Sequence, residues 1–317
     1  MLLVVSVLVT GCRGDEPDGE RSPQGSPDVR GSCGPLAFED VRGRPPQHLA
    51  TDELARFPND RDACAGVWLR TGRGFVPQGL AVEGRTAWVS GFDGNARVGY
   101  RFCRIERIDL RTGRRLDTLD PVTGQVGDRP PVGCHHGGGL VRDEHGLWLV
   151  ETGRLWLIDP DALEVERAWA LASPLRGSFA LHDDDGRLGI GRWHPHRRAQ
   201  VDWFDTDELI GSSALDITEA MSTGHTVAPR ATQGAVWAER PWFAQSVTRC
   251  GVLSGPGRRG FVPGAEGMAL VGKRSMWVVS EAGTRHYQDL GGRPVVPQLI
   301  RMDVSRVRSW SGPDCEL

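Results

Sequence analysis

A unit of two short apolar runs separated by a tight turn recurs along this chain, and the repeat restricts the possible folds more than any other feature. Residues 75–91 read FVPQGLAVEGRTAWVSG, and residues 261–280 read FVPGAEGMALVGKRSMWVVS. In both copies a Gly-containing turn separates the runs, and the second run contains a Trp-Val pair. Short apolar runs separated by such turns are typical of β-hairpins. Their repetition indicates a closed all-β architecture.

Further copies of the unit begin near residues 136, 178 and 233, so five are visible, at a spacing of roughly 30 to 60 residues that suits propeller blades. A single sheet of this kind cannot bury both faces, and blades packed face to face in a ring solve that problem. We therefore predict an all-β fold, a β-propeller. Six blades are the preferred number, the sixth combining residues 33–70 with the C-terminal tail, and five blades are the alternative.

These units resemble the six-bladed propeller superfamily that includes NHL-repeat proteins, the SMP-30/gluconolactonase group and streptogramin-lyase-like proteins. The resemblance extends from about Arg70 to Val304 and rests on the Pro-x-Gly-Leu-Ala start of the first run and the Trp-Val or Trp-Leu pair of the second. It implies the architecture. It does not imply one activity, because the same scaffold hosts lactonases, lyases and pure binding modules.

The first ten residues, MLLVVSVLVT, form an apolar run that is too short to span a bilayer but suits a signal peptide. The string Leu8-Val9-Thr10-Gly11-Cys12 that ends this segment resembles the lipobox of bacterial lipoproteins. The resemblance implies lipidation of Cys12, and a free or disulfide-bonded Cys12 is the alternative. We expect a signal peptide at 1–11, a polar tether at 12–32 and a propeller domain at 33–317, anchored on the extracytoplasmic face of the cell membrane.

Lipidation of Cys12 would leave six of the seven cysteines, and none of them forms a C-x-x-C pair. An oxidising compartment favours disulfides for such a set. Sequence order suggests three pairs, although six cysteines permit many others: Cys33–Cys64, Cys103–Cys134 and Cys250–Cys315.

The charge balance excludes one class of partner. The chain has 38 basic and 41 acidic residues, a net charge of -3, and no clustered basic patch. Nucleic-acid binders need such a patch to neutralise phosphates, so we expect no nucleic-acid partner. The expected partners are the membrane, through Cys12, and an unknown small molecule or envelope protein, and the expected state is a monomer. A purely structural role in an envelope assembly is a further alternative.

Propeller geometry brings two kinds of position to one mouth of the central channel: the residues that begin each innermost strand, and the loops between second and third strands. Polar residues occupy both kinds of position. The first set is Gln78, His135, His136, Ser178, Gln233 and Glu266, and the second is Asp93, Glu151, His194, His196 and Glu281.

The leading prediction is that this face binds a ligand or partner, with Gln78, His135, Gln233, Asp93 and His194 as polar contacts and Trp193 as a stacking surface. The alternative is a lactonase-like hydrolase or lyase with His136 and Glu266 as catalytic residues. In that case Glu151, Glu266 and His136 would bind Ca²⁺ or Mg²⁺, since hard cations take oxygen ligands. A third possibility is that these groups only hydrogen-bond to one another and to water.

Two local strings bear on the same face. Three glycines follow His136, and they are interpreted as letting the backbone approach a ligand closely. The loop containing His194 and His196 also contains three arginines, which oppose cation binding and favour contact with an anion.

Overall fold

The computed structural model describes residues 33–70, 74–97, 100–289 and 294–317. The predicted signal peptide, the tether and Cys12 lie outside these described residues. Within them, no helix combines the length and the apolar character that crossing a bilayer requires.

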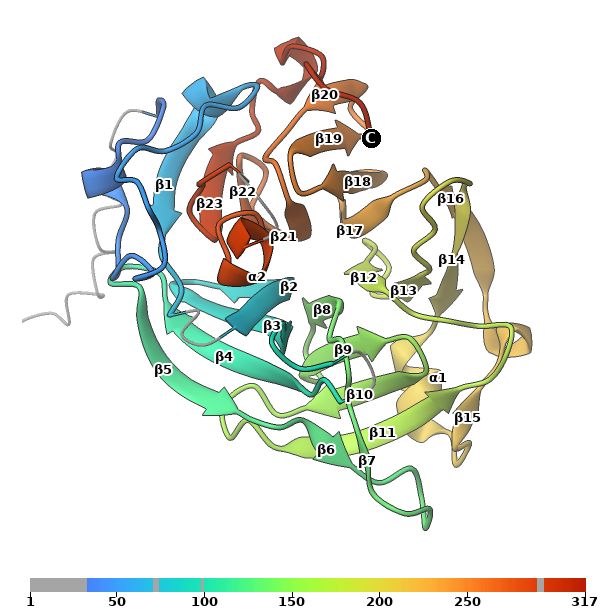
Figure 1. Cartoon of the computed structure of the whole chain (residues 1–317). Helices are drawn as coiled ribbons and strands as arrows, with labels where there is room; N and C mark the ends of the chain where they lie inside the picture. The colour runs from blue at the N-terminus through green and yellow to red at the C-terminus, as the bar shows by residue number, and fades with distance from the viewer. Residues whose placement is uncertain (1–32, 71–73, 98–99, 290–293) are drawn as a thin grey trace, which may run out of the picture. The chain divides into compact units, whose positions relative to one another are not determined.

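Five antiparallel sheets surround a central channel (Figure 1). Blade 1 consists of β2 (Phe75–Glu83), β3 (Thr86–Asp93), β4 (Cys103–Asp109) and β5 (Arg114–Leu119). Blade 2 consists of β8 (Gly139–Arg142), β9 (Leu147–Glu151), β10 (Arg154–Ile158) and β11 (Val165–Leu171), with the short β15 (Asp216–Ile217) added in parallel. A two-stranded ribbon of β6 (Thr123–Gly124) and β7 (Val132–Gly133) precedes blade 2.

The remaining blades follow the same order from the channel outward. Blade 3 consists of β12 (Phe179–His182), β13 (Leu188–Gly191), β14 (Ala199–Phe204) and β16 (Gly224–Ala228), with helix α1 (Thr206–Gly211) between its last two strands. Blade 4 consists of β17 (Thr232–Trp237), β18 (Pro241–Val247), β19 (Cys250–Ser254) and β20 (Arg258–Gly260). Blade 5 consists of β21 (Ala265–Val271), β22 (Ser275–Ser280), β23 (Leu299–Asp303) and β1 (Ala63–Val67).

The predicted β-propeller is confirmed, and the number of blades is five rather than the preferred six. The innermost strands β2, β8, β12, β17 and β21 contact one another in that order, and β21 contacts β2, so the ring is closed. Residues 33–70 do not form a blade of their own. They contribute only the outermost strand β1, which pairs with β23 through Val67 opposite Leu299. Closure by strands from both chain ends therefore occurs within the fifth blade.

Tryptophans in the second strand of three blades pack between neighbouring sheets. Trp88, Trp148 and Trp277 are all buried. Trp148 of blade 2 belongs to a hydrophobic cluster with Ile190 of blade 3, and Trp277 of blade 5 belongs to a cluster with Leu80 of blade 1. Large aromatic side chains bury much apolar surface, so these residues stabilise the ring at the contacts between blades.

Glycines in or directly before the innermost strands allow these strands to approach one another. A Cβ atom on Gly234 would lie 2.2 Å from the carbonyl oxygen of Glu266 in the next inner strand, and one on Gly138 would lie 2.2 Å from the carbonyl oxygen of Ser178. No side chain fits at either position. Gly138 therefore makes room for the neighbouring strand, and the prediction that the glycines after His136 let the backbone approach a ligand stays a prediction.

The six cysteines of the described residues form three disulfides in sequence order. Cys33 is bonded to Cys64 beside β1, Cys103 to Cys134 across the connection between blades 1 and 2, and Cys250 to Cys315 at the C-terminus. Disulfides persist where the environment is oxidising, so their number indicates an extracytoplasmic protein.

Candidate functional site

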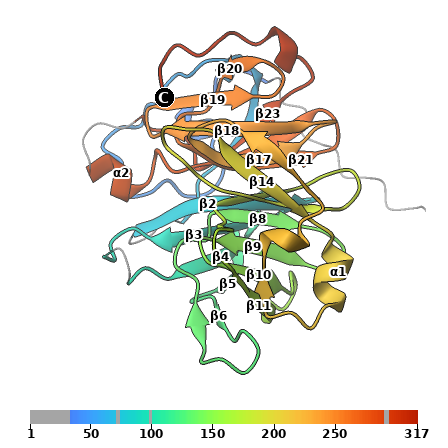
Figure 2. The ribbon, with the colours of Figure 1, turned by 90° about the vertical axis from the view of Figure 1, so that its right-hand side faces the viewer.

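The central channel has a polar mouth where the innermost strands begin. A cavity of about 280 Å³ opens there. Helix α2 (Arg285–Asp289) covers part of this side of the ring, and Figure 2 shows α2 and α1 on opposite sides of the sheets. The residues that line the cavity are Gln78, His136, Glu151, Thr152, Gly177, Ser178, Trp193, Gln233, Glu266, Glu281 and Tyr287.

Every blade contributes to this polar mouth. The contributions are Gln78 from blade 1, His136 and Glu151 from blade 2, Ser178 and Trp193 from blade 3, Gln233 from blade 4, and Glu266 and Glu281 from blade 5. Residues at corresponding places in the repeated unit meet here because the five inner strands point the same way along the channel. Eight residues singled out from the sequence are thus in one cavity, and their roles stay predictions.

Two buried carboxyl groups line this cavity. Glu266 is 2% exposed and Glu281 is 5% exposed. Gln233 Nε2 donates a hydrogen bond of 2.9 Å to Glu266 Oε1, and Gln78 Nε2 donates one of 3.0 Å to Glu281 Oε2. Each carboxyl group is therefore held by an amide from a neighbouring blade.

Burial changes the proton affinity of both groups. Desolvation raises the pKa of Glu281 to about 7, against the opposing effect of hydrogen bonds from Tyr287 and Gln78. Desolvation, followed by repulsion from the Glu281 carboxylate, raises the pKa of Glu266 well above its usual range. The Tyr287 pKa is also raised, first by burial and then by the two carboxylates, so its hydroxyl remains a hydrogen-bond donor at neutral pH.

The ring of His136 is uncharged at neutral pH. Burial, and to a lesser extent the nearby Arg101 guanidinium, lower its pKa to about 4. The imidazole stacks on Phe92 with ring centroids 4.8 Å apart. A neutral imidazole both donates and accepts hydrogen bonds, so His136 can bind a polar group of a ligand, whereas its lowered pKa disfavours uptake of a proton.

Glu151 differs from the other two glutamates of the cavity. It is 3% exposed, and its Oε1 atom forms a 2.8 Å ion pair with Arg154 Nη1. Arg154 also donates a hydrogen bond to the carbonyl oxygen of Gly133, which fixes its position. The negative charge of Glu151 is thus matched within the protein.

The divalent-cation site with Glu151, Glu266 and His136 as ligands stays a prediction. Glu151, Glu266 and His136 line one cavity, but within the described ranges no three His, Cys, Asp or Glu side chains come close enough together to hold a metal ion. A hard cation needs several oxygen ligands at once. Glu266 comes from blade 5 and the other two side chains from blade 2, and the carboxylate of Glu151 is paired with Arg154.

Two other predicted contacts point away from the cavity. Through Nδ1, His135 donates a 2.8 Å hydrogen bond to the Arg101 carbonyl oxygen, and its ring stacks on Phe102. His135 lies in a bend before β8, and of the two histidines only His136 lines the cavity. Asp93 is exposed and accepts a hydrogen bond from the backbone of Asn95, which makes it a turn residue.

The loop containing His194 and His196 also lies outside the polar mouth. His194 lines a separate cavity of about 200 Å³ together with Arg176, Arg192 and Arg197. Its Nδ1 atom accepts hydrogen bonds from the backbone of His196 and Arg197, so the ring fixes the loop. Of this loop only Trp193, which is 42% exposed, reaches the main cavity.

Sequence reasoning missed Tyr287 and Thr152. Tyr287 is one of only two tyrosines and follows Glu281 by six residues, within the loop type from which Glu281 itself was selected. Thr152 directly follows Glu151. Both residues follow the second strand of a blade, and this position could have identified them. Among the polar residues of these loops, only acidic residues and histidines were selected from the sequence.

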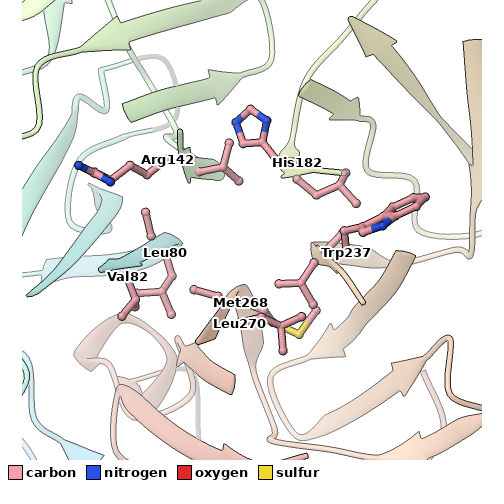
Figure 3. Close-up of a pocket in the computed structure, with 13 residues that line it drawn as sticks. Leu80, Val82, Arg142, His182, Trp237, Met268 and Leu270 are labelled. Atoms are coloured by element: carbon pink, nitrogen blue, oxygen red, sulfur yellow. The ribbon is translucent and has the colours of Figure 1, made fainter. Parts of the chain in front are cut away.

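The opposite mouth of the channel is apolar. A cavity of about 190 Å³ lies where the innermost strands end, and Figure 3 shows side chains of all five strands converging on it. Leu80, Val82, Met268 and Leu270 line much of it. Among the labelled side chains, Arg142, His182 and Trp237 alone bring polar atoms to this rim.

No protein-family model matches the sequence, and no curated protein does. Distant similarity to solved structures is found. The PQQ-bound aldose sugar dehydrogenase of Streptomyces coelicolor is 14% identical over 73% of this chain and 95% of its own, with a TM-score of 0.39. A calcium-binding protein, regucalcin, from Agrobacterium tumefaciens is 12% identical over 78% of this chain and 93% of its own, with a TM-score of 0.36. Likeness at this level carries no information about a ligand.

Proposed function

We propose that this protein is a membrane-anchored, extracytoplasmic propeller that binds a small polar molecule at the polar mouth of its channel. One observation carries the proposal: polar side chains from all five blades surround a single cavity of about 280 Å³. Small-molecule sites are typically concave, with a few convergent polar groups at the junction of structural units. The common axis of five blades is such a junction.

The cavity offers different contacts at different depths. The buried carboxyl groups of Glu266 and Glu281 and the amides of Gln78 and Gln233 supply donors and acceptors inside. The half-exposed indole of Trp193 lies at the rim, where it can stack on a ligand. A wet channel that merely satisfies its own polar groups would not require an aromatic side chain in this exposed position.

The proposal is tested by blocking the cavity. The purified protein is heated with amines, polyols, amino acids and sugar acids, and at least one class is expected to raise the Tm. Thr152 is exposed and lines the cavity, so Thr152→Trp fills it with little cost to folding. The matched control Val227→Trp changes a 55% exposed residue of β16. Ligand stabilisation that is absent throughout, or that survives Thr152→Trp unchanged, overturns the proposal.

Anchoring through Cys12 has separate support. The lipobox-like string, the polar residues after it and the three disulfides of the folded part are all features of exported lipoproteins. After expression of the full chain in a bacterium, the parent protein is expected in the membrane fraction and Cys12→Ser in the soluble fraction. Equal membrane association of both proteins, or an N-terminal peptide without the mass of a lipid, would refute the anchor.

A further inference from the structure

The charges that line the polar mouth are all of one sign. Its described lining contains three glutamates and neither Lys nor Arg. Arg154 matches Glu151, but Glu266 and Glu281 form no ion pair with any described residue, and their side-chain partners there are Gln233, Gln78 and Tyr287. When they are ionised, these two buried carboxyl groups therefore have no cationic partner among the described residues that line the cavity, and the Arg101 guanidinium outside that lining acts on His136 and Tyr287.

Away from the channel, the described part of the chain pairs a fully buried glutamate with cations. The side chain of Glu106 has no exposure, and Arg104 and Arg115 lie 3.0 and 3.2 Å from its Oε1 atom. Removing a carboxylate from water is unfavourable unless a cation or several hydrogen bonds replace the solvent. The fold thus supplies two cations to Glu106 in the sheet and none to Glu266 and Glu281 at the channel mouth.

We propose that the ligand of the polar mouth is a small organic cation, an amine or a quaternary ammonium compound, whose charge lies against Glu266 and Glu281. This inference rests on the proposed function of the cavity and names its ligand class. A bound cation supplies the counter-charge that the protein lacks there. The cavity holds about nine water volumes of about 30 Å³ each, which is enough for a compact cation.

The aromatic residues of the lining favour an organic cation over a metal ion. A hard metal ion needs about six oxygen ligands, and in the described part of the chain no three acidic or histidine side chains gather to begin such a set. An ammonium group needs only negative charge and aromatic faces. Tyr287 and the half-exposed Trp193 line the same cavity as the two carboxyl groups.

The test compares cations with neutral molecules of the same shape. Titration calorimetry of the full-length protein at pH 8 and low ionic strength uses putrescine against 1,4-butanediol, and choline against 3,3-dimethylbutan-1-ol. At least one cation is expected to bind at least tenfold more tightly than its neutral counterpart. Glu266→Gln and Glu281→Gln keep the side-chain shape and are each expected to weaken that binding at least tenfold. The exposed Glu164→Gln, as control, changes it less than twofold.

The outcomes separate the inference from the function on which it rests. Equal binding of the neutral molecule and the cation, or unchanged binding in both glutamine variants, overturns the inference and leaves a site for an uncharged ligand. Binding of CaCl₂ or MgCl₂ without binding of either organic cation also overturns it in favour of a metal. The proposed function itself fails under two conditions together. No compound binds in the calorimetry, and no compound of the thermal panel gives a stabilisation that Thr152→Trp removes.

Discussion

The two mouths of the channel are built by the same five strands, yet one is polar and acidic and the other is apolar. In β2, Gln78 faces the polar cavity and Leu80 and Val82 face the apolar one. In β21, Glu266 and Met268 divide in the same way. In both strands the register with the neighbouring strand shifts between the two ends, at Gln78 in β2 and between Ala265 and Met268 in β21, as at a β-bulge. Position along one strand thus decides whether a residue serves binding or folding.

The difference between the mouths is also one of stability. Transfer of an apolar side chain out of water is favourable, whereas burial of an unpaired carboxyl group is unfavourable. The apolar end is therefore expected to stabilise the fold and the polar end to destabilise it. The tight contacts between inner strands, such as that of Gly234 with Glu266, lie between the two ends and support both.

The largest expected effect comes from placing a side chain at that tight contact. In Gly234→Ala the new Cβ would lie 2.2 Å from a backbone carbonyl oxygen, which cannot move without parting two inner strands. We expect a loss of about 4 kcal/mol in the free energy of unfolding. Urea denaturation measures it. The control Gly224→Ala, in β16, has open space around its Cβ and is expected to change stability by less than about 0.5 kcal/mol. A loss of unfolding free energy in Gly234→Ala that is as small as that in Gly224→Ala would show that the inner strands are not tightly packed.

A matched pair on β2 compares the mouths directly. Leu80 is 1% exposed, and Leu80→Ala is expected to cost about 3 kcal/mol through lost burial and a residual cavity. Gln78 is 3% exposed, and Gln78→Ala removes one hydrogen bond to Glu281, at a cost of about 1 kcal/mol. The difference is measured from denaturation midpoints at one pH. A larger loss in Gln78→Ala would reverse the division of roles between the mouths.

The two buried carboxyl groups of the polar mouth should make stability depend on pH near neutrality. The pKa of Glu281 is raised from 4.5 to about 7 and that of Glu266 is also raised, so the folded protein keeps protons that the unfolded chain has released. The contribution of these two groups is then greatest below about pH 4.5 and falls as the pH rises through about 7, by on the order of 3 kcal/mol for Glu281. His136, whose pKa is lowered to about 4, contributes in the opposite direction between pH 4 and 6.5. Denaturation curves across this range, corrected with a Glu266→Gln, Glu281→Gln double variant, measure the effect. An equally steep fall in the double variant would assign it to other groups.

The ring and the gathering of residues at its mouth could be predicted because both follow from local patterns. The short apolar runs, the turn glycines and the Trp-Val or Trp-Leu pairs predict the hairpins, and equivalent positions of the repeat meet at one mouth. The number of blades was overcounted because β1 was taken as part of a separate unit. A lone strand that completes another sheet has no pattern of its own in the sequence.

The electrostatics of the site could not be predicted in the same way. Glu151 and Glu281 follow second strands in the same manner, yet only Glu151 has an arginine beside it, three residues later in the next strand. The choice between His135 and His136 depends on the conformation of the irregular segment that precedes β8, where His135 lies in a bend and Gly137 has a positive φ. These properties depend on the conformations of single loops and side chains, and local patterns do not contain that information.

The smallest expected effect on stability, and the most selective one on binding, concerns the tryptophans at the two rims. Trp193, 42% exposed at the polar mouth, contributes little to the core, so Trp193→Ala is expected to change stability by less than about 0.5 kcal/mol. Choline affinity should fall about threefold, the effect of losing one exposed cation–π contact. Trp237 at the apolar rim donates a hydrogen bond to Asp184 and packs edge-on against Trp203. Trp237→Ala should therefore reduce stability and leave choline affinity unchanged. Calorimetry and denaturation on both variants test this crossed pattern, and weaker choline binding in Trp237→Ala would mean that the two mouths do not act separately.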